Sequence, residues 1–111
     1  MPATNIPAVN AGALDKRVTL LRPVYNEWQD EVASWEPVSE VWASIGPVLV
    51  TERNEADRIV SWAQVPIVIR YRADLDPRWR IQYRTHTYEI DGMRDILARH
   101  VQLELTCKEV V

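Results

Sequence analysis

The sequence predicts an all-β protein, a small antiparallel β-barrel or sandwich of about six strands with one long loop or short helix. Apolar and polar residues alternate with a period of two in several short runs, which is typical of strands that bury one face. Turn-forming residues separate these runs. No stretch has the apolar spacing of a helix long enough to cover a parallel sheet, so an all-β class is favoured over an α/β class.

Length and composition indicate one globular domain. The chain has 111 residues, of which 47% are hydrophobic and 26% charged. We divide it into an N-terminal arm, residues 1–13, and a single β domain, residues 14–111. The arm has no clear period, and we interpret it either as a segment that orders when something docks on it or as plain terminal disorder.

The same numbers exclude several classes of protein. A single cysteine rules out an internal disulfide, and a net charge of −3 does not indicate a protein that coats nucleic acid. No apolar run approaches the roughly 20 residues of a membrane-spanning helix. The first fourteen residues contain no lysine or arginine, which argues against a signal peptide. We expect a soluble, cytoplasmic domain.

The first half of the domain contains two expected strands and one irregular segment. Val18 and Leu20 alternate with polar residues in the first strand. Residues 35–47 form the second, in which two apolar sets compete for the core, as in a strand covered on both faces or one with a bulge. These sets are Val41, Ala43 and Ile45 against Val38 and Trp42. Residues 48–63 break the alternation, and we expect a short helix over 52–58, capped by Thr51, or a mobile loop.

The second half alternates more regularly. Residues 65–72 and 78–84 are predicted to pair as an antiparallel hairpin across the turn at 73–77. Another strand, around Tyr88 and Ile90, follows a tight connection at Thr85 and His86. Residues 92–99 form a connection with at most one helical turn. The last strand begins at 101 and places these residues inside: Val101, Leu103, Leu105 and Cys107.

Residues capable of catalysis do not converge, so we expect no catalytic residues, no metal site and no cofactor. His86 and His100 both lie in polar contexts, as surface histidines do. Cys107 falls on the apolar face of its strand, where cysteine behaves as a small hydrophobe. Asp74 and Asp76 have a spacing that suits a divalent cation, but a turn before a proline accounts for both more simply.

Five arginines form the most distinctive pattern, which we call the arginine stripe. They should share the outer face of the predicted hairpin, beside Glu89 and Asp91 of the next strand. The stripe fits a protein interface or a solvated face better than nucleic acid, because the nearby aromatic residues should point to the opposite face. Its members are Arg70, Arg72, Arg78, Arg80 and Arg84.

Trp28 lies in a polar turn, residues 26–31. It is either an exposed contact anchor or folded back onto the rim of the barrel.

Several stretches match one known family in their order and spacing. They are residues 14–20 (LDKRVTL), 41–47 (VWASIGP), Glu52 with Ala56, residues 67–72 (IVIRYR) followed by Asp74, Leu75 and Pro77, residues 88–90 (YEI) and residues 103–109 (LELTCKE). Together they resemble the phage head–tail joining proteins, also called head-closure or neck stopper proteins.

This resemblance implies a non-enzymatic β-barrel subunit of a ring in the neck of long-tailed phages or of gene-transfer particles derived from them. The ring would lie between portal and adaptor proteins above and tail-terminator or tail-tube proteins below. It would close the DNA-filled head, dock the tail and let double-stranded DNA pass without sequence-specific binding. Localisation would be the virion neck, and the host cytoplasm before assembly, with no membrane contact.

The resemblance also assigns residues. In the family, the polar segment after the second block reaches into the channel, and here the candidates are Glu52, Arg53, Asn54, Glu55, Asp57 and Arg58. A closed ring needs two complementary surfaces on each subunit, for which Trp28, Glu89, Asp91 and the arginine stripe are the candidates. The alternatives are a tail-completion or tail-terminator subunit, and a small barrel that binds single-stranded nucleic acid.

Overall fold

The computed structural model describes residues 13–56 and 58–110, without the side chains of residues 51, 53–55 and 59–62. Seven strands follow in chain order: β1 (Lys16–Tyr25), β2 (Val32–Ile45), β3 (Leu49–Glu55), β4 (Arg58–Arg70), β5 (Arg80–Tyr83), β6 (His86–Asp95) and β7 (Gln102–Glu109). A short 3-10 turn, η2 (Ile96–Ala98), lies between β6 and β7. The described residues contain no α-helix, which confirms the all-β class.

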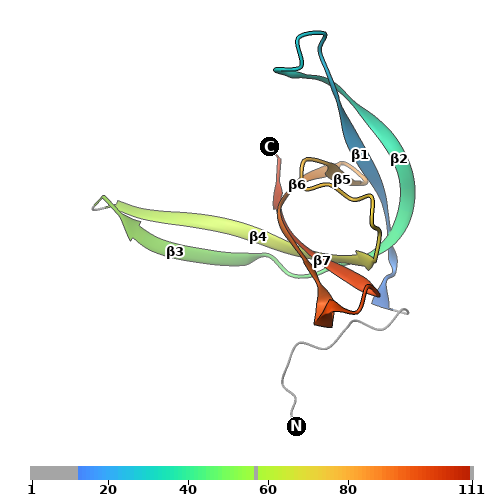
Figure 1. Cartoon of the computed structure of the whole chain (residues 1–111). Coiled ribbons are helices and arrows are strands. Elements are labelled where there is room, and N and C mark those ends of the chain that lie inside the picture. The colour runs from blue at the N-terminus through green and yellow to red at the C-terminus, as the bar shows by residue number, and fades with distance from the viewer. Residues whose placement is uncertain (1–12, 57, 111) are drawn as a thin grey trace.

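Six of the strands form a ring, so the fold is a barrel rather than a sandwich. The strand order is β2-β1-β5-β6-β7-β4-β3, and an additional pairing of β2 with β4 joins the two sides. All pairings are antiparallel, and β3 lies outside the ring against the first half of β4. Figure 1 shows two long hairpins, β1–β2 and β3–β4, projecting from the barrel in different directions.

A short seam between β2 and β4 closes the ring. Only three residue pairs make it, from Ala43 opposite Ile69 to Ile45 opposite Ile67. Just beyond, the backbone N–H of Gly46 donates to the carbonyl of Pro66 over 2.8 Å. A Cβ atom at Gly46 would lie 2.8 Å from Cγ of Pro66, so this close approach requires glycine.

The interior is filled by alternate residues of the ring strands. The side chains that are fully buried include Leu20 of β1, Ile67 and Ile69 of β4, Ile81 of β5 and Leu105 of β7. Burial of an aliphatic side chain of this size stabilises the fold by about 1.5–3 kcal/mol. The predicted inward faces of these strands are therefore confirmed.

A β-bulge explains the two competing apolar sets of β2. Leu20 lies opposite Ser39 but Leu21 lies opposite Pro37, so Val38 is the extra residue. The bulge lets Val38 and Val41 both pack against the core although their spacing is odd. Trp42 faces outward and is 49% exposed. Of the two explanations offered for this strand, the bulge is confirmed.

Residues 48–63 do not form the predicted helix or loop. Seven residue pairs, from Leu49 opposite Gln64 to Glu55 opposite Arg58, join β3 to β4 as a hairpin. A helix of one or two turns gains few backbone hydrogen bonds, whereas a hairpin pairs the whole segment. β-branched residues near its base, such as Val48 and Val50, suit a strand better than a helix.

The predicted pairing of residues 65–72 with 78–84 is wrong. β4 pairs with β7 and β2, while β5 pairs with β1 and β6, so β4 and β5 lie on opposite sides of the ring. Residues 71–79 must therefore cross an end of the barrel instead of reversing direction. Leu75 and Trp79 are buried in this crossing and join the core cluster, which explains its course.

The final connection also differs from the prediction. β6 continues to Asp95, with Asp91 as the extra residue of a bulge between Ile90 and Gly92. The helical turn is present as η2. Val101, which we placed inside, is 53% exposed, whereas Gln102 is buried.

We predict that Ile81→Ala lowers the free energy of unfolding by about 2–5 kcal/mol, because it leaves a cavity in the barrel. Urea unfolding followed by tryptophan fluorescence measures the change. Gln82→Ala, one residue along the same strand and exposed, is the matched control and should change stability by less than about 0.5 kcal/mol. Equal effects of the two substitutions would contradict the assignment of the inner face.

Candidate interaction surfaces

The histidines do not form a catalytic centre. His86 is half exposed and its Nδ1 lies 2.7 Å from Oε2 of Glu109. His100 stacks on Tyr71 with ring centroids 4.6 Å apart, and its Nε2 lies 3.3 Å from Oδ2 of Asp95. No group of three or more histidine, cysteine or carboxylate side chains that would hold a metal ion occurs among the described residues. Both histidines lie at the surface, as predicted.

Cys107 is buried in the barrel and is not a nucleophile. Desolvation by burial raises the pKa of its thiol to about 12, and the nearby charge of Asp91 adds to the shift. Because the thiolate is the reactive form, this cysteine stays unreactive at physiological pH. Its predicted role as a small buried hydrophobe is confirmed.

The two aspartates of the crossing segment are held by arginines. Nε and Nη2 of Arg72 donate to the two carboxylate oxygens of Asp74, each over 2.9 Å. Asp76 accepts from the backbone N–H of Arg78 at 2.8 Å and from its guanidinium at 3.0 Å. Hydrogen bonds from these arginines lower the pKa of both carboxyl groups. The pattern is turn chemistry, as the sequence indicated.

The arginine stripe does not exist as one surface, because the hairpin that was expected to carry it does not form. Arg70 ends β4 opposite Gln102, whereas Arg80 lies in β5 on the other side of the ring. Arg72 and Arg78 belong to the crossing and bind their neighbouring aspartates. The physical reason is the route of residues 71–79 across the barrel end.

Part of the expected arrangement of opposite charges is present. Arg80 lies directly opposite Glu89 in the β5–β6 pair, and its guanidinium lies 4.3 Å from the ring centroid of Trp35. Asp91 is exposed at the bulge of β6. Arg84 lies in the β5–β6 turn, where its guanidinium covers the ring of Tyr83 at 5.2 Å.

The β3–β4 hairpin is the longest feature outside the ring and contains the channel-loop candidates. Glu52 and Arg58 have exposed side chains near its tip. Arg53, Asn54 and Glu55 lie in β3, but their side chains are outside what the structure describes, and Asp57 lies outside the described residues altogether. The apolar residues at the base of the hairpin, Val48, Leu49 and Val50, are exposed.

Trp28 lies at the tip of the β1–β2 hairpin and is 76% exposed. The folded-back alternative is therefore wrong, and the role of Trp28 as a contact anchor stays a prediction. The turn beneath it is well bonded. Asn26 donates from its backbone N–H to the carbonyl of Glu31 over 2.9 Å, and its side-chain amide donates to Asp30 over 2.8 Å.

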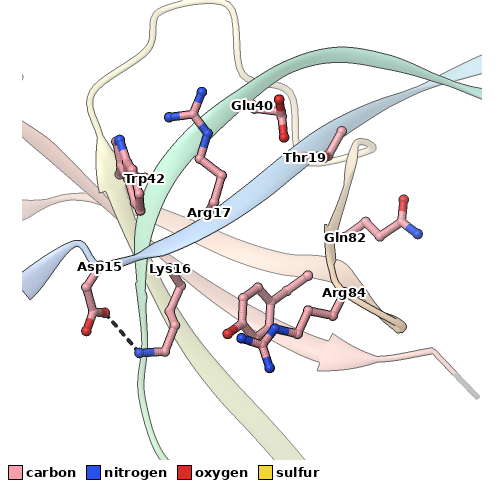
Figure 2. Close-up of a pocket in the computed structure, with 9 residues that line it drawn as sticks. Asp15, Lys16, Arg17, Thr19, Glu40, Trp42, Gln82 and Arg84 are labelled. Atoms are coloured by element: carbon pink, nitrogen blue, oxygen red, sulfur yellow. Dashed lines mark hydrogen bonds and ion pairs between the residues drawn. The ribbon is translucent and has the colours of Figure 1, made fainter.

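A groove that sequence reasoning missed crosses the outer surface of β2, β1 and the end of β5 (Figure 2). Its volume is about 610 Å³. The guanidinium of Arg17 lies 5.1 Å from the ring centroid of Trp42, and Lys16 pairs with Asp15 over 3.1 Å. Glu40, Gln82 and Arg84 also line the groove. The groove depends on strand register, in which Arg17 faces Trp42 and Thr19 faces Gln82, so no local sequence signal could have revealed it.

Comparison with known proteins decides the family. Residues 9–110 match the family described as phage head completion protein. The chain belongs to this family. Phage head completion proteins are structural components of phage or phage-like particles and not enzymes, so the resemblance identified in the sequence is confirmed.

Two solved structures share the fold of this head completion protein. One comes from the virion of a native gene transfer agent particle, with a TM-score of 0.63 and 21% identity over 87% of this chain and 96% of that chain. At this identity the match concerns the fold. The other is a protein from Shigella flexneri 2a, solved in solution, with a TM-score of 0.58 and 26% identity over 91% of this chain and 96% of that chain. No curated protein matches the chain.

Within residues 13–56 and 58–110, no helix is long and apolar enough to cross a membrane.

We predict that the Cys107 thiol of the folded head completion protein resists labelling by Ellman's reagent at pH 8. With a folded-state pKa of about 12 against an ordinary value of 9.0, its thiolate population is lower by about 1,000-fold. In denaturant, one thiol per chain should react promptly. Because burial raises this pKa, the thiol's contribution to stability is complete below pH 9 and is lost as the pH rises toward 12. Rapid labelling of the folded protein would contradict the burial of Cys107.

Proposed function

We propose that this head completion protein is a subunit of a homo-oligomeric ring in the neck of a tailed phage or phage-like particle. The ring closes the DNA-filled head below the portal and adaptor proteins and offers a docking surface to the tail-terminator or tail-tube proteins. Double-stranded DNA passes through its channel without sequence-specific binding. Before assembly the subunit resides in the host cytoplasm.

The observation that carries this proposal is the β3–β4 hairpin. Its seven residue pairs give an arm about 20 Å long beyond the barrel. The second half of β4 is fixed in the ring between β7 and β2, and the strand is continuous from Arg58 to Arg70. An arm built on a strand of the barrel wall holds its direction, so it suits a subunit that must place a segment in a central channel (Figure 1).

The charge of the arm fits a segment along which DNA has to slide. Residues 52–58 contain two arginines and three carboxylates, a sum of −1. Tight binding of phosphates requires an excess of basic side chains, which this segment lacks. Contact with DNA is therefore weak and reversible.

The remaining candidates provide surfaces for neighbours. Arg80 with Glu89 presents paired charges on one side of the barrel, and Trp28 presents an exposed indole at the end of the other hairpin. Arg70 and Asp91 are exposed as well. A closed ring requires two different surfaces on each subunit, and these groups lie on different parts of the fold, the barrel wall and the tip of the β1–β2 hairpin.

The alternatives differ in observable ways. A module for single-stranded nucleic acid needs exposed aromatic rings among basic side chains, and the predicted hairpin does not supply them, because Trp79 is buried and the arginines of the stripe are dispersed. A tail-completion or tail-terminator subunit is separated by its deletion phenotype. Loss of a neck ring leaves leaky heads beside finished tails, whereas loss of a terminator leaves tails of uncontrolled length.

We predict that shortening the arm impairs DNA retention without unfolding the subunit. In the shortened chain, Asn-Gly replaces residues 52–61, so that the turn follows the pair Thr51–Trp62 in the existing register. The core positions of β4 begin at Val65 and are untouched. Particles carrying this variant should contain the protein but lose packaged DNA, measured as nuclease-sensitive DNA after head filling.

A matched control keeps the length of the arm. Glu52→Gln with Arg58→Gln removes two exposed charges near the tip, and it should leave retention closer to wild type than the shortened arm does. Full DNA retention by the shortened variant would reject the channel role of the hairpin.

A further inference from the structure

The tip of the β1–β2 hairpin and the groove at the start of β1 have complementary chemistry. The tip, residues 26–31, contains Trp28 and three acidic residues and no basic one. All three acidic residues, Glu27, Asp30 and Glu31, are exposed. The groove contains three cations, Lys16, Arg17 and Arg84, against two carboxylates, Asp15 and Glu40.

Two of the three cations of the groove are available to a ligand. Lys16 is engaged by Asp15, but neither Arg17 nor Arg84 has a carboxylate within salt-bridge distance in the part of the chain that the structure describes. Both guanidinium groups lie on aromatic faces, Arg17 on Trp42 and Arg84 on Tyr83. An arginine between two aromatic rings gains cation–π energy on both of its faces, and tryptophan is the best ring for this contact.

Hydrogen bonds hold the tip in a fixed conformation in the single subunit. Its backbone is held by the Asn26–Glu31 hydrogen bond and by a second one, from the N–H of Gln29 to the carbonyl of Asn26 over 3.0 Å. The Asn26 side chain is bonded to Asp30 at both its amide and its carbonyl oxygen. A rigid exposed tryptophan loses little conformational entropy on docking, which is typical of residues that dominate interfaces.

A subunit's own tip cannot occupy its own groove. The two features lie at opposite ends of the β1–β2 ribbon, and from Arg17 to Tyr25 the extended strand covers about 26 Å (Figure 1). The contact must therefore form between molecules. A contact between different surfaces of identical chains is head-to-tail, and such contacts generate rings when the rotation closes.

We propose that the acidic, tryptophan-bearing tip of one copy of this chain docks in the basic, aromatic-lined groove of the next copy, with Trp28 against Arg17. This interface rests on the proposed ring and names the two surfaces that join its subunits. The occupant of the groove is a second copy of the chain.

Cysteine cross-linking tests the contact in assembled particles. Gln29→Cys and Gln82→Cys replace two exposed, uncharged side chains, one beside Trp28 and one in the groove, and leave the proposed contacts intact. Cys107 does not compete, because it is buried and un-ionised. Mild oxidation of the double variant should give a ladder of covalent multiples of the chain, whereas either single variant gives none.

The matched control moves the second cysteine across the barrel. Lys108→Cys is exposed on β7, three strands from β1 in either direction around the ring, and together with Gln29→Cys it should give no ladder. The proposal is overturned if the Gln29–Gln82 pair gives no multiples of the chain, or if only adducts with another virion protein appear. If the particles are filled with DNA and still contain the chain, the proposed neck function is retained. If the chain is absent from the neck, the neck function is rejected instead.

Charge reversal gives a second measurement. Arg17→Glu with Arg84→Glu should lower incorporation of the chain into particles about tenfold or more, and so should Glu27→Arg with Glu31→Arg. The four changes together should restore much of the loss, since the charges are again opposite. Circular dichroism checks that each variant is folded. Failure of the combined variant to recover, with every variant folded, would overturn the proposed pairing.

Discussion

Closure of the ring at the β2–β4 seam is the constraint on which the rest of the molecule depends. Three residue pairs and the Gly46–Pro66 hydrogen bond join the two sides. The seam is tight, with Ala43 fully buried in it and no space for a Cβ at Gly46. Once it closes, β4 and β5 face each other across the barrel, and the chain between them has to cross an end. Leu75 and Trp79 of this crossing segment are buried and pack in the core.

Closure also decides where the molecule can meet others. Closure pairs each of the six ring strands on both sides over part of its length, while unpaired edges remain on the two projecting hairpins. The interior is occupied by buried apolar side chains and includes the buried thiol of Cys107. A protein built in this way acts through its arms and its outer surface, in agreement with a structural role in a particle.

The sequence predicted the wall of the barrel better than its connections. Alternation located β1, β5, β6 and β7, because each buries one face against the same core and therefore has apolar residues at every second position. It also detected the irregularity of β2, whose bulge at Val38 shifts the pattern by one residue. The β3–β4 arm was missed since the neighbouring residues Leu49 and Val50, which point to opposite faces of β3, are both exposed, and without a buried face there is no alternation to detect.

The failure of the arginine stripe has a different cause. Each arginine was assigned correctly to a polar position, but their grouping depended on which strands pair. The hydrogen bonds at Asp74 and Asp76 fit a hairpin turn as well as a segment that crosses the end of the barrel. Only burial of Leu75 and Trp79 distinguishes the two. The groove has the same dependence on register, because Arg17 and Gln82 come together only when β1 lies between β2 and β5.

The shape of the proposed assembly depends on the β1–β2 hairpin. In the proposed contact, the tip and the groove are the two ends of a single ribbon, so the bend of that ribbon would set the angle between neighbouring subunits. Two register shifts set the bend, one at Val38 and one where Val24 faces Ser34 but Tyr25 faces Val32. A head-to-tail contact closes only for particular rotations and otherwise produces a filament. In the proposed assembly, the bulge that seats Val38 in the core would therefore also help to determine whether successive copies meet in a ring.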